Sequence, residues 1–488
     1  MPEKQTFKQT LQMNRSYLGK ACRLHFESSP MKVVKSSRQY LCDDSGNEYL
    51  DCISNIAHVG HCHPHVVRAG QEQLATLVAC SGFLNEKSVE YAKRIIETLP
   101  EKLCVCFIVN SGSEANDLAI RLARGYTGHE DVLIVDQAFH GSVSTIADLS
   151  PYKWKKLGLV KKDWVHVVPL PDTYRGKYRE DCANPGVNYA NEAKSLIQKA
   201  HEKNRNIAAF ICEAVMVTAG VIPYPPNFLT QTFRHVREAG GLCIIDEVQT
   251  GLGRIGDHFW AFQSHDVIPD ILTVGKPLGN GFPMAMLVTS REIADTLSEY
   301  KNSFGGNPLA CAVGLAVLDV IQNEKLQSSA KSVGKCLKDG LNAIAKNHPM
   351  IGDVRGMGMI VGIEIVVDKE SRKPAPEAAD LLAFKLKENH KIIIASEGPD
   401  KNVMLMTPPL CFTCDNARHV IQAIDTALAE IEKGASEVGL TASSFGDGKT
   451  DIPLNILSAP VTSLYSSEEE DSDSESPKKK QKIYEDVD

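Results

Sequence analysis

The segment CVCFIVNSGSEANDLAIRLAR, residues 104–124, joins an apolar run to a helical pattern through a short polar loop. The run CVCFIV has the length and composition of a buried β-strand. After the loop, apolar residues recur every three or four positions, as they do on the buried face of a helix. These residues are Ala115, Leu118, Ala119, Leu122 and Ala123. A strand, a tight loop and a helix in this order are typical of proteins in which strands alternate with helices.

Four further apolar runs of the same kind follow along the chain. They are VLIV (132–135), IAAFIC (207–212), LCII (242–245) and ILTV (271–274), and helical patterns separate them. Alternation of short strands with helices predicts a mostly parallel β-sheet covered by helices, because a parallel connection needs a long crossover. We therefore expect an α/β fold with a large domain built on such a sheet.

The two ends of the chain have a different pattern. In QYLCDDSGNEYLDC, residues 39–52, two apolar runs flank a turn sequence, which predicts a β-hairpin. A helical stretch, LACAVGLAVLDVI, leads to a mixed region that we expect to join this hairpin in a smaller α+β domain. Residues 466–488 combine an acidic, Ser-rich run with a Lys cluster, which predicts disorder. The expected limits are 1–55 and 311–435 for the smaller domain, 56–310 for the large domain and 436–488 for a disordered tail.

Composition excludes some classes of function. The chain has 488 residues and a net charge of -8, which argues against a nucleic-acid-binding protein. The longest apolar stretch carries Glu213 in its middle, so no membrane span is predicted. Fourteen cysteines are scattered through apolar stretches, which favours reduced thiols and an intracellular location. Residues 4–26 are basic and lack acids, which fits a mitochondrial address or an ordinary first helix, so the matrix and the cytoplasm both stay open.

Polar residues follow the predicted strands. The loop Asn110–Ser113 enters a helix, where free N–H groups and hydroxyls can bind an anion, although a simple N-cap serine is the alternative. Phe139, two loops further on, could stack on a flat ligand or belong to the core. Glu213 and Asp246 each end a strand, and a buried carboxylate at that place needs a cationic partner or a cap.

The segment DILTVGKPLGNG, residues 270–281, places Lys276 just past a predicted strand. The lysine could be solvated, could belong to a phosphate-binding loop, or could form a Schiff base with a carbonyl cofactor. Asp270 and Pro277 exclude the second possibility, because that loop needs Gly and Ser or Thr at these positions. Pyridoxal phosphate explains all the strand-end residues together. It needs a phosphate cradle, a stacking surface, a carboxylate on its ring nitrogen and a lysine.

A metal site is the competing explanation for HVGHCHP, residues 58–64. This segment contains His58, His61 and His63 with Cys62 between them, but no fourth ligand follows at the usual spacing. A turn packed near the site is the favoured interpretation, and we predict no metal.

Several motifs, in order and spacing, resemble the class III aminotransferases of fold type I. They are NSGSEANDLAIRLAR, FHG, DEVQTGLGR, GKPLGNG and SFGGNPLACAVGLAVL. CISNIAHVGHCHP, PDTYRGKYRED and GDVRGMG look like the alanine–glyoxylate aminotransferase 2-like branch, which includes ethanolamine-phosphate phospho-lyase and 5-phosphohydroxy-lysine phospho-lyase. The resemblance covers roughly residues 14–432. It implies pyridoxal phosphate, a small-molecule amine substrate and a homodimer, or a tetramer of such pairs, with shared active sites.

The resemblance also implies roles for individual residues. Lys276 is the imine lysine, Asp246 pairs with the ring nitrogen, and Glu213 completes the catalytic set. Ser303, where the family usually has Thr, reaches the phosphate from the other subunit. The remaining cofactor contacts are Ser111, Gly112 and Ser113 at the phosphate, Phe139 with His140 beside the ring, Val248 behind it and Gln249 near its 3-hydroxyl.

The substrate side departs from the branch. Leu405 and Thr407 stand where the phospho-lyases usually have Lys, and Cys80 and Gly82 replace an amide and a guanidinium. Two more donors are lost near the strand ends, where the chain has Ser142 and Val221. A phosphate needs charge-assisted contacts, and Lys87, Lys301 and Arg355 are candidates to supply them.

Three functions are compatible with this pattern. The first is a phospho-lyase that eliminates phosphate and ammonia from an O-phosphorylated amine, either phosphoethanolamine or 5-phosphohydroxylysine. The second is a class III transaminase with another amine donor, which Leu405 and Val221 would suit. The third is a catalytically weak dimer that only binds the cofactor, and retention of Lys276 and Asp246 argues against it.

Overall fold

The computed structural model describes residues 5–437. Apart from its first two residues, the predicted disordered tail, residues 436–488, lies outside this part of the chain. The larger helices are α1 (Phe7–Tyr17), α2 (Pro64–Leu74), α3 (Glu86–Ile96), α4 (Gly112–Thr127), α7 (Pro185–His201), α8 (Phe228–Glu238), α10 (Pro308–Asn323), α11 (Leu326–Ile344), α12 (Pro376–His390) and α13 (Cys414–Glu437), and the short ones are α5 (Ser144–Asp148), α6 (Pro151–Leu157) and α9 (Arg291–Ala294).

A seven-stranded sheet forms the centre of the large part of the protein, in the order β4-β10-β9-β8-β7-β5-β6. All five predicted strands are present in it, and β6 and β10 are additions. In this sheet β10 runs opposite to the other six strands, so the prediction of a mostly parallel sheet is confirmed. The strands are β4 (Val105–Val109), β5 (Asp131–Val135), β6 (Val165–Val168), β7 (Ile207–Glu213), β8 (Leu242–Asp246), β9 (Ile271–Val274) and β10 (Ala285–Thr289).

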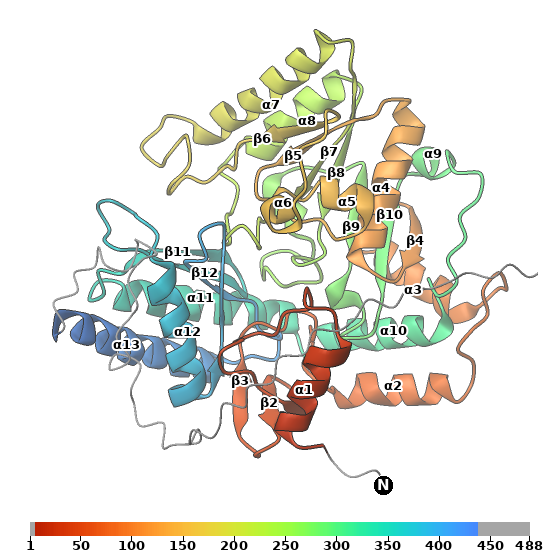
Figure 1. Ribbon diagram of the computed structural model, residues 1–488. Helices are drawn as coiled ribbons and strands as arrows, with labels where there is room; N and C mark the ends of the chain where they lie inside the picture. Colours follow the sequence, from red (N-terminus) through yellow and green to blue (C-terminus); the bar gives the residue numbers. More distant parts are fainter. Residues whose placement is uncertain (1–4, 438–488) are drawn as a thin grey trace, which may run out of the picture. The chain divides into compact units, whose positions relative to one another are not determined.

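Helices cover both faces of this sheet (Figure 1). On one face, Ala209 and Ile211 of β7 share a fully buried apolar cluster with the residues of α4. Phe210, which lies between them in sequence, points to the other face, where its ring meets Phe233 of α8 at 6.4 Å. The alternation follows from the two-residue period of a strand.

The parallel strands place their carboxyl ends at one edge of the sheet. β5, β7, β8 and β9 run in the same direction, and β4 joins them because β10 is antiparallel to both β4 and β9. The residues that follow these strands therefore emerge side by side, as they do in other open α/β sheets.

Both chain ends contribute to the smaller α+β part, as predicted. β2 (Tyr40–Asp43) and β3 (Glu48–Asp51) form the expected hairpin, and β3 pairs in parallel with β13 (Ile392–Ile393) from the other end of the chain. The described residues belong to one compact unit, and the expected domain limits stay a prediction. The other strands of this part are β1 (Val33–Ser37), β11 (Ile351–Met357), β12 (Ile360–Ile365), β14 (Ala395–Glu397) and β15 (Val403–Met406).

Candidate active site

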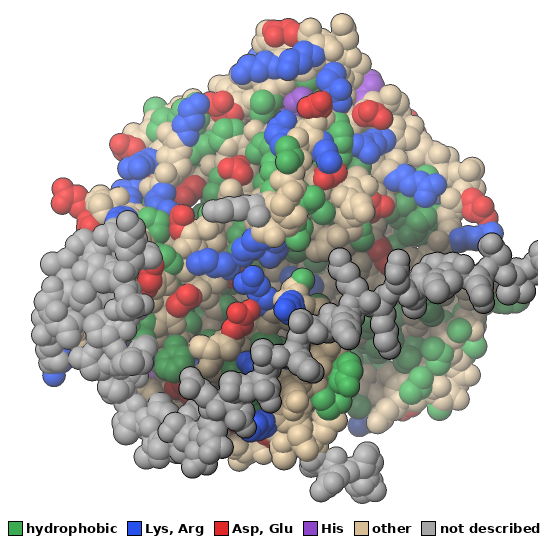
Figure 2. Space-filling model, in the orientation of Figure 1, with side chains coloured by type: hydrophobic (Ala, Val, Ile, Leu, Met, Phe, Trp, Pro, Cys, Tyr) green, Lys and Arg blue, Asp and Glu red, His purple; other side chains and the backbone are tan. Residues whose placement is uncertain are grey.

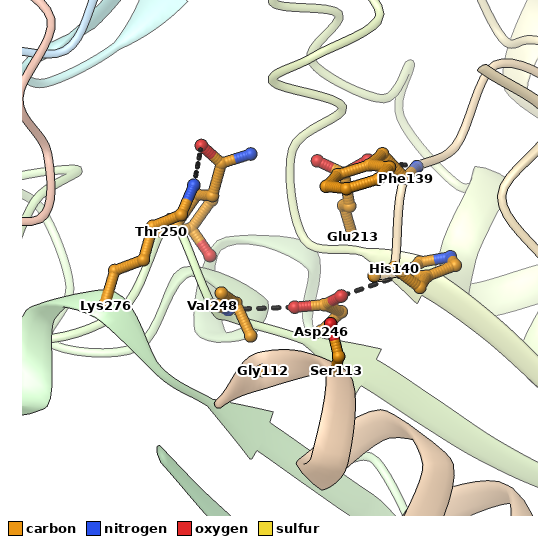
Figure 3. Close-up of a pocket in the computed structure, with 11 residues that line it drawn as sticks. Gly112, Ser113, Phe139, His140, Glu213, Asp246, Val248, Thr250 and Lys276 are labelled. Atoms are coloured by element: carbon orange, nitrogen blue, oxygen red, sulfur yellow. Dashed lines mark hydrogen bonds and ion pairs between the residues drawn. The ribbon is translucent and has the colours of Figure 1, made fainter. Parts of the chain in front are cut away.

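A cavity of about 150 Å³ opens at the carboxyl edge of the large sheet (Figure 3). It brings together most of the residues that the sequence singled out, from five separate segments of the chain. Its lining is made of Gly112, Ser113, Phe139, His140, Gly141, Glu213, Asp246, Val248, Gln249, Thr250 and Lys276.

Lys276 begins a short 3-10 turn directly after β9 and Gly275. Its side chain is half-buried rather than solvated, and its Nζ donates to Oε1 of Gln249 at 2.8 Å. Burial lowers the pKa of Lys276 to about 8, although the carboxylates of Glu213 and Asp246 act in the opposite direction. At neutral pH a fraction of this amine is therefore unprotonated, as a nucleophile or base requires.

Asp246 ends β8 and is only 4% exposed. Its Oδ2 accepts from Nδ1 of His140 at 2.9 Å and from Nδ2 of Asn116 at 2.8 Å, while its Oδ1 accepts from the Val248 N–H at 2.9 Å. The hydroxyl of Thr273 fixes Asn116 in turn, at 2.6 Å. The carboxylate is thus held in one orientation at the cavity wall.

Glu213 ends β7, the strand next to Asp246. Burial raises its pKa to about 7, and the nearby Asp246 acts in the same direction. Its two oxygens accept the backbone N–H groups of Phe139 at 3.3 Å and Val217 at 3.1 Å. Glu213 therefore fixes the loop that carries Phe139.

Helix α4 points its first residues at the cavity. Ser111 caps this helix by accepting the Glu114 N–H at 3.2 Å, so the plain N-cap interpretation holds for its hydroxyl, and Ser111 does not line the cavity. Gly112 and Ser113 do line it. A Cβ on Gly112 would lie 2.8 Å from Cγ2 of Val248, so only glycine lets the helix end approach this closely.

Gln249 connects the cavity to other parts of the chain. Its Oε1 accepts from Nδ2 of Asn55 at 2.8 Å, in addition to Lys276, and its Nε2 donates to Oγ1 of Thr218 at 3.3 Å. Sequence reasoning missed Asn55, Asn116 and Thr250. Asn116 did carry a signal, because it is a polar residue on the apolar face of α4.

These residues fit pyridoxal phosphate. The helix N-terminus at Gly112 offers N–H groups to a phosphate, and Phe139 and Val248 give the cavity its apolar surfaces. Asp246 presents a fixed carboxylate and Lys276 an amine of lowered pKa. A phosphorylated aromatic aldehyde with a basic ring nitrogen requires this donor set.

Ser303 lies in a different place within the chain. It lines a second cavity, of about 1130 Å³, together with Cys80 and Gly82, and none of the three touches the cavity around Lys276. The side chain of Phe304, on the same cavity, is 71% exposed. A contribution of Ser303 from a second subunit therefore stays a prediction.

The other four substrate-side substitutions do not line the first cavity either. Val221 is fully buried against Gly362, and Thr407 donates its hydroxyl to the Ile53 carbonyl at 3.1 Å. Leu405 is half-buried on β15, between Gly362 and Ala395. The fourth, Ser142, is exposed, and its N–H donates to Oγ of Ser113 at 3.1 Å.

The three cations considered as substitutes have other partners. Arg355 donates to the carbonyls of Gly220 and Val221 and pairs with Glu364 at 2.5 Å. Lys301 has a side chain that is 86% exposed and pairs with Glu299, and Lys87 pairs with Glu90. None of them lines the cavity around Lys276.

The histidines of HVGHCHP point to three separate partners. His58 meets the Leu252 carbonyl at 2.9 Å, and burial together with the charge of Arg254 lowers its pKa to about 3. His61 contacts Asp51 at 2.7 Å and His63 contacts Glu324 at 2.9 Å. Within residues 5–437, no three metal-ligating side chains are grouped for a metal ion.

All fourteen cysteines are unpaired. The chain has one Cys-x-x-Cys spacing, Cys411 to Cys414, which the sequence predictions did not include, and both of its thiols are free and half-buried. Among the described helices, none is both long and apolar enough to cross a membrane.

Comparisons with known proteins identify the family of the chain. The family Aminotransferase class-III matches residues 25–428. A relative named alanine–glyoxylate aminotransferase 2-like, from Drosophila melanogaster, is 42% identical over 89% of this chain and 91% of its own. Ethanolamine-phosphate phospho-lyase homolog 1 from Caenorhabditis elegans is 41% identical over 86% of this chain and 92% of its own. A phospholyase from Arthrobacter, solved in complex with phosphoethanolamine, matches at a TM-score of 0.81 and 33% identity, over 86% of this chain and 99% of its own.

Proposed function

The chain belongs to the class-III aminotransferase family of pyridoxal-phosphate-dependent enzymes, and on this premise we propose that it is a phospho-lyase. Its substrate would be an O-phosphorylated amine, phosphoethanolamine or 5-phosphohydroxylysine. The observation that carries the proposal is the resemblance, over 86% of the chain, to a phospholyase solved with phosphoethanolamine. The lysine and two carboxylates that share one cavity support it.

When bound, pyridoxal phosphate supplies a ring that withdraws electrons from the carbon next to the substrate amine. Lys276 would hold the cofactor through Nζ, release it to the substrate amine, and then remove the proton from that carbon. Its lowered pKa, about 8, suits this use as a base near neutral pH. The C–O bond on the neighbouring carbon then breaks and phosphate leaves, and water completes the reaction to an aldehyde and ammonia.

The other lining residues would bind and orient. Gly112 and Ser113 would donate hydrogen bonds to the cofactor phosphate at the N-terminus of α4, with Ser111 next to them. Asp246, held by Asn116 and His140, would keep a proton on the ring nitrogen through its negative charge.

Four further lining residues would shape the surroundings of the ring. Phe139 and Val248 would pack on its two faces, Gln249 would lie near its 3-hydroxyl, and Glu213 would keep the Phe139 loop in place through its backbone contact.

A transaminase is the second candidate. The uncharged side chains of Leu405 and Val221 favour it, because the phospho-lyase branch usually has hydrogen-bond donors at these two positions and a phosphate needs such contacts. Both functions need proton removal by Lys276, and they differ in whether a phosphate leaves. A protein that binds the cofactor without turnover is the third possibility.

The test is release of inorganic phosphate from phosphoethanolamine and 5-phosphohydroxylysine by the cofactor-loaded protein. Lys276→Ala serves as the blank, and it should also lose the borohydride-reducible bond to the cofactor. Release above the blank supports the phospho-lyase. No release from a protein with that bond intact refutes it, and an amine-donor screen then separates a transaminase from a protein without turnover.

The assembly that we propose is a homodimer, or a tetramer of such pairs, in an intracellular compartment, either the mitochondrial matrix or the cytoplasm. Phe83 and Phe304 support it as large apolar side chains that line the cavity of Ser303 and are exposed in the single chain. Light scattering of the purified protein measures the assembly. A monomer at micromolar concentration would contradict it, together with the proposed sharing of Ser303 between subunits.

A further inference from the structure

We propose that Lys153, Lys156 and Lys401 form an anion-binding subsite that holds the phosphate of the substrate amine. This inference rests on the proposed function and identifies where the charge of its substrate would be bound. Three positions at which the branch usually carries cations are uncharged here, namely Gly82, Leu405 and Thr407, and Cys80 stands in place of an amide.

The subsite adjoins the cavity of Lys276 through Phe139. Helix α6 begins at Pro151, shortly after the loop that carries Phe139, and the Tyr152 N–H donates to the Ala138 carbonyl at 3.3 Å. Nζ of Lys153 lies 5.4 Å from the centre of the Phe139 ring. One ammonium group of the cluster is therefore next to a wall of the cofactor cavity.

The ring of Tyr152 organises the cluster. Nζ of Lys153 lies 5.0 Å from its centre, Nζ of Lys156 lies 5.4 Å away and Nζ of Lys401 lies 5.8 Å away. An aromatic face within about 6 Å attracts a cation, so one ring keeps three ammonium groups together. Lys and Arg side chains gather in the middle of the face on which α6 is drawn (Figures 1 and 2).

The cluster carries more positive than negative charge. Glu397 is its one carboxylate among the described residues, and it accepts from both the Tyr152 hydroxyl and Nζ of Lys401 at 2.6 Å. Lys153 and Lys156 have no ion pair with any described residue. The three ammonium groups therefore outnumber the one carboxylate, and a phosphate dianion would offset their excess positive charge.

Repulsion within the cluster supports the same conclusion. Burial and the charges of Lys401, Lys153 and Arg23 lower the pKa of Lys156. A bound dianion would offset this repulsion, whereas a neutral or cationic substrate group would not. The chemistry of the subsite therefore favours an amine that carries a phosphate over one that carries an apolar group.

The experiment measures binding of inorganic phosphate to the cofactor-loaded protein by isothermal titration calorimetry. The cofactor fills the phosphate site at Gly112, so added phosphate reports on a second anion site. Lys153→Gln and Lys156→Gln should each weaken phosphate binding about tenfold, because a hydrogen bond to a charged group contributes about that much. Lys153→Arg should retain binding, and Lys161→Gln, an exposed lysine beyond α6, is the matched control.

The result also separates the subsite from the proposed function. Equal phosphate affinity in wild type, Lys153→Gln, Lys156→Gln and Lys161→Gln overturns the subsite, even if the protein releases phosphate from phosphoethanolamine. If Lys153→Gln and Lys156→Gln lose phosphate affinity but the wild type releases no phosphate from phosphoethanolamine, the anion site is supported and the phospho-lyase is refuted. If both hold, KM for phosphoethanolamine rises about tenfold in Lys153→Gln while kcat changes little.

Discussion

The cavity around Lys276 has a volume of about 150 Å³, whereas the cavity around Ser303 has about 1130 Å³. The smaller one contains an amine of lowered pKa and a carboxyl group of raised pKa, Lys276 and Glu213. The larger one contains Lys301 and Glu299, which pair with each other, and the exposed ring of Phe304. Size alone would have selected the wrong cavity for the chemistry.

The difference teaches that buried ionisable side chains held by hydrogen bonds, rather than volume, distinguish a reaction site. Asp246 accepts three hydrogen bonds and Gln249 takes part in three, so each side chain has one defined position. Such preorganisation is what a site needs to stabilise charge that develops during a reaction. The cavity around Ser303 instead has the apolar exposure typical of a protein contact surface.

Among the tests that separate the cavity around Lys276 from the cavity around Ser303, Asp246→Asn should produce the largest loss of activity. The substitution keeps the shape of the side chain and removes its charge, so kcat should fall by about 10²- to 10³-fold. Lys276 should still bind the cofactor, which the visible absorbance of the protein reports.

Asp131→Asn is the matched control for this substitution. Asp131 is as buried as Asp246 and also contacts a histidine, His166 at 2.7 Å, but it lies at the start of β5, away from the cavity. It should lower stability and leave kcat unchanged. An equal loss of kcat in both variants would mean that Asp246 acts only through folding.

Glu213→Gln should change how stability depends on pH. The pKa of Glu213 is about 7 in the folded protein, above its ordinary value of 4.5, so the folded state favours the protonated form. The stability that this proton contributes is present below pH 4.5 and is lost as the pH rises through 7. In the cofactor-free protein, the free energy of unfolding of Glu213→Gln relative to wild type should therefore rise between about pH 5 and pH 8, by up to about 3 kcal/mol.

Urea unfolding at these two pH values measures the gain. Burial also raises the pKa of Glu247 to about 7, but Glu247 does not line the cavity. Glu247→Gln should therefore show a similar dependence of stability on pH. It should leave the pH dependence of kcat/KM as it is in wild type. A gain for Glu213→Gln that is the same at both pH values would contradict the raised pKa.

Gly112→Ala should weaken cofactor binding about tenfold. The new Cβ would lie 2.8 Å and 3.0 Å from the two methyl groups of Val248, so this side chain, which lines the cofactor cavity, must shift. Val248→Ala in the same chain removes both methyl groups and should restore part of the affinity. Gly19→Ala, where a Cβ meets no atom within 4 Å, is the control. If Val248→Ala does not restore cofactor affinity to Gly112→Ala, the loss of affinity does not come from the contact with Val248.

The sequence predicted the strand-end residues well for a physical reason. Apolar runs identify strands, and parallel strands bring their carboxyl ends to one edge, so the sequence alone was enough to place Asp246 and Lys276 together. The direction of β10 could not be predicted, because an apolar run does not encode pairing. Asn55 and Asn116 were missed since their contacts with Gln249 and Asp246 join segments far apart in sequence.

The same limit applies to the substrate side. The resemblance to the branch identified the positions that lack cations, but it could only suggest replacements by residue type, and Lys87, Lys301 and Arg355 have other partners. The lysines around Tyr152 come from α6 and from the turn after β14, which only the folded chain brings together.

Leu405→Lys should have the smallest effect, and it tests the substrate side most directly. It restores a cation at a position where the phospho-lyase branch usually has one, but Leu405 lies on β15 and does not line the cavity of Lys276. If Lys153 and Lys156 already bind the phosphate, the new charge should change KM for phosphoethanolamine by less than about threefold, since an exposed or half-exposed charge pair contributes little. Steady-state kinetics with the matched change Leu405→Met distinguishes the charge from the altered shape. A fall in KM of about tenfold for the lysine variant alone would mean that phosphate binds beside β15, and that the lysines around Tyr152 serve only to hold α6 against Glu397.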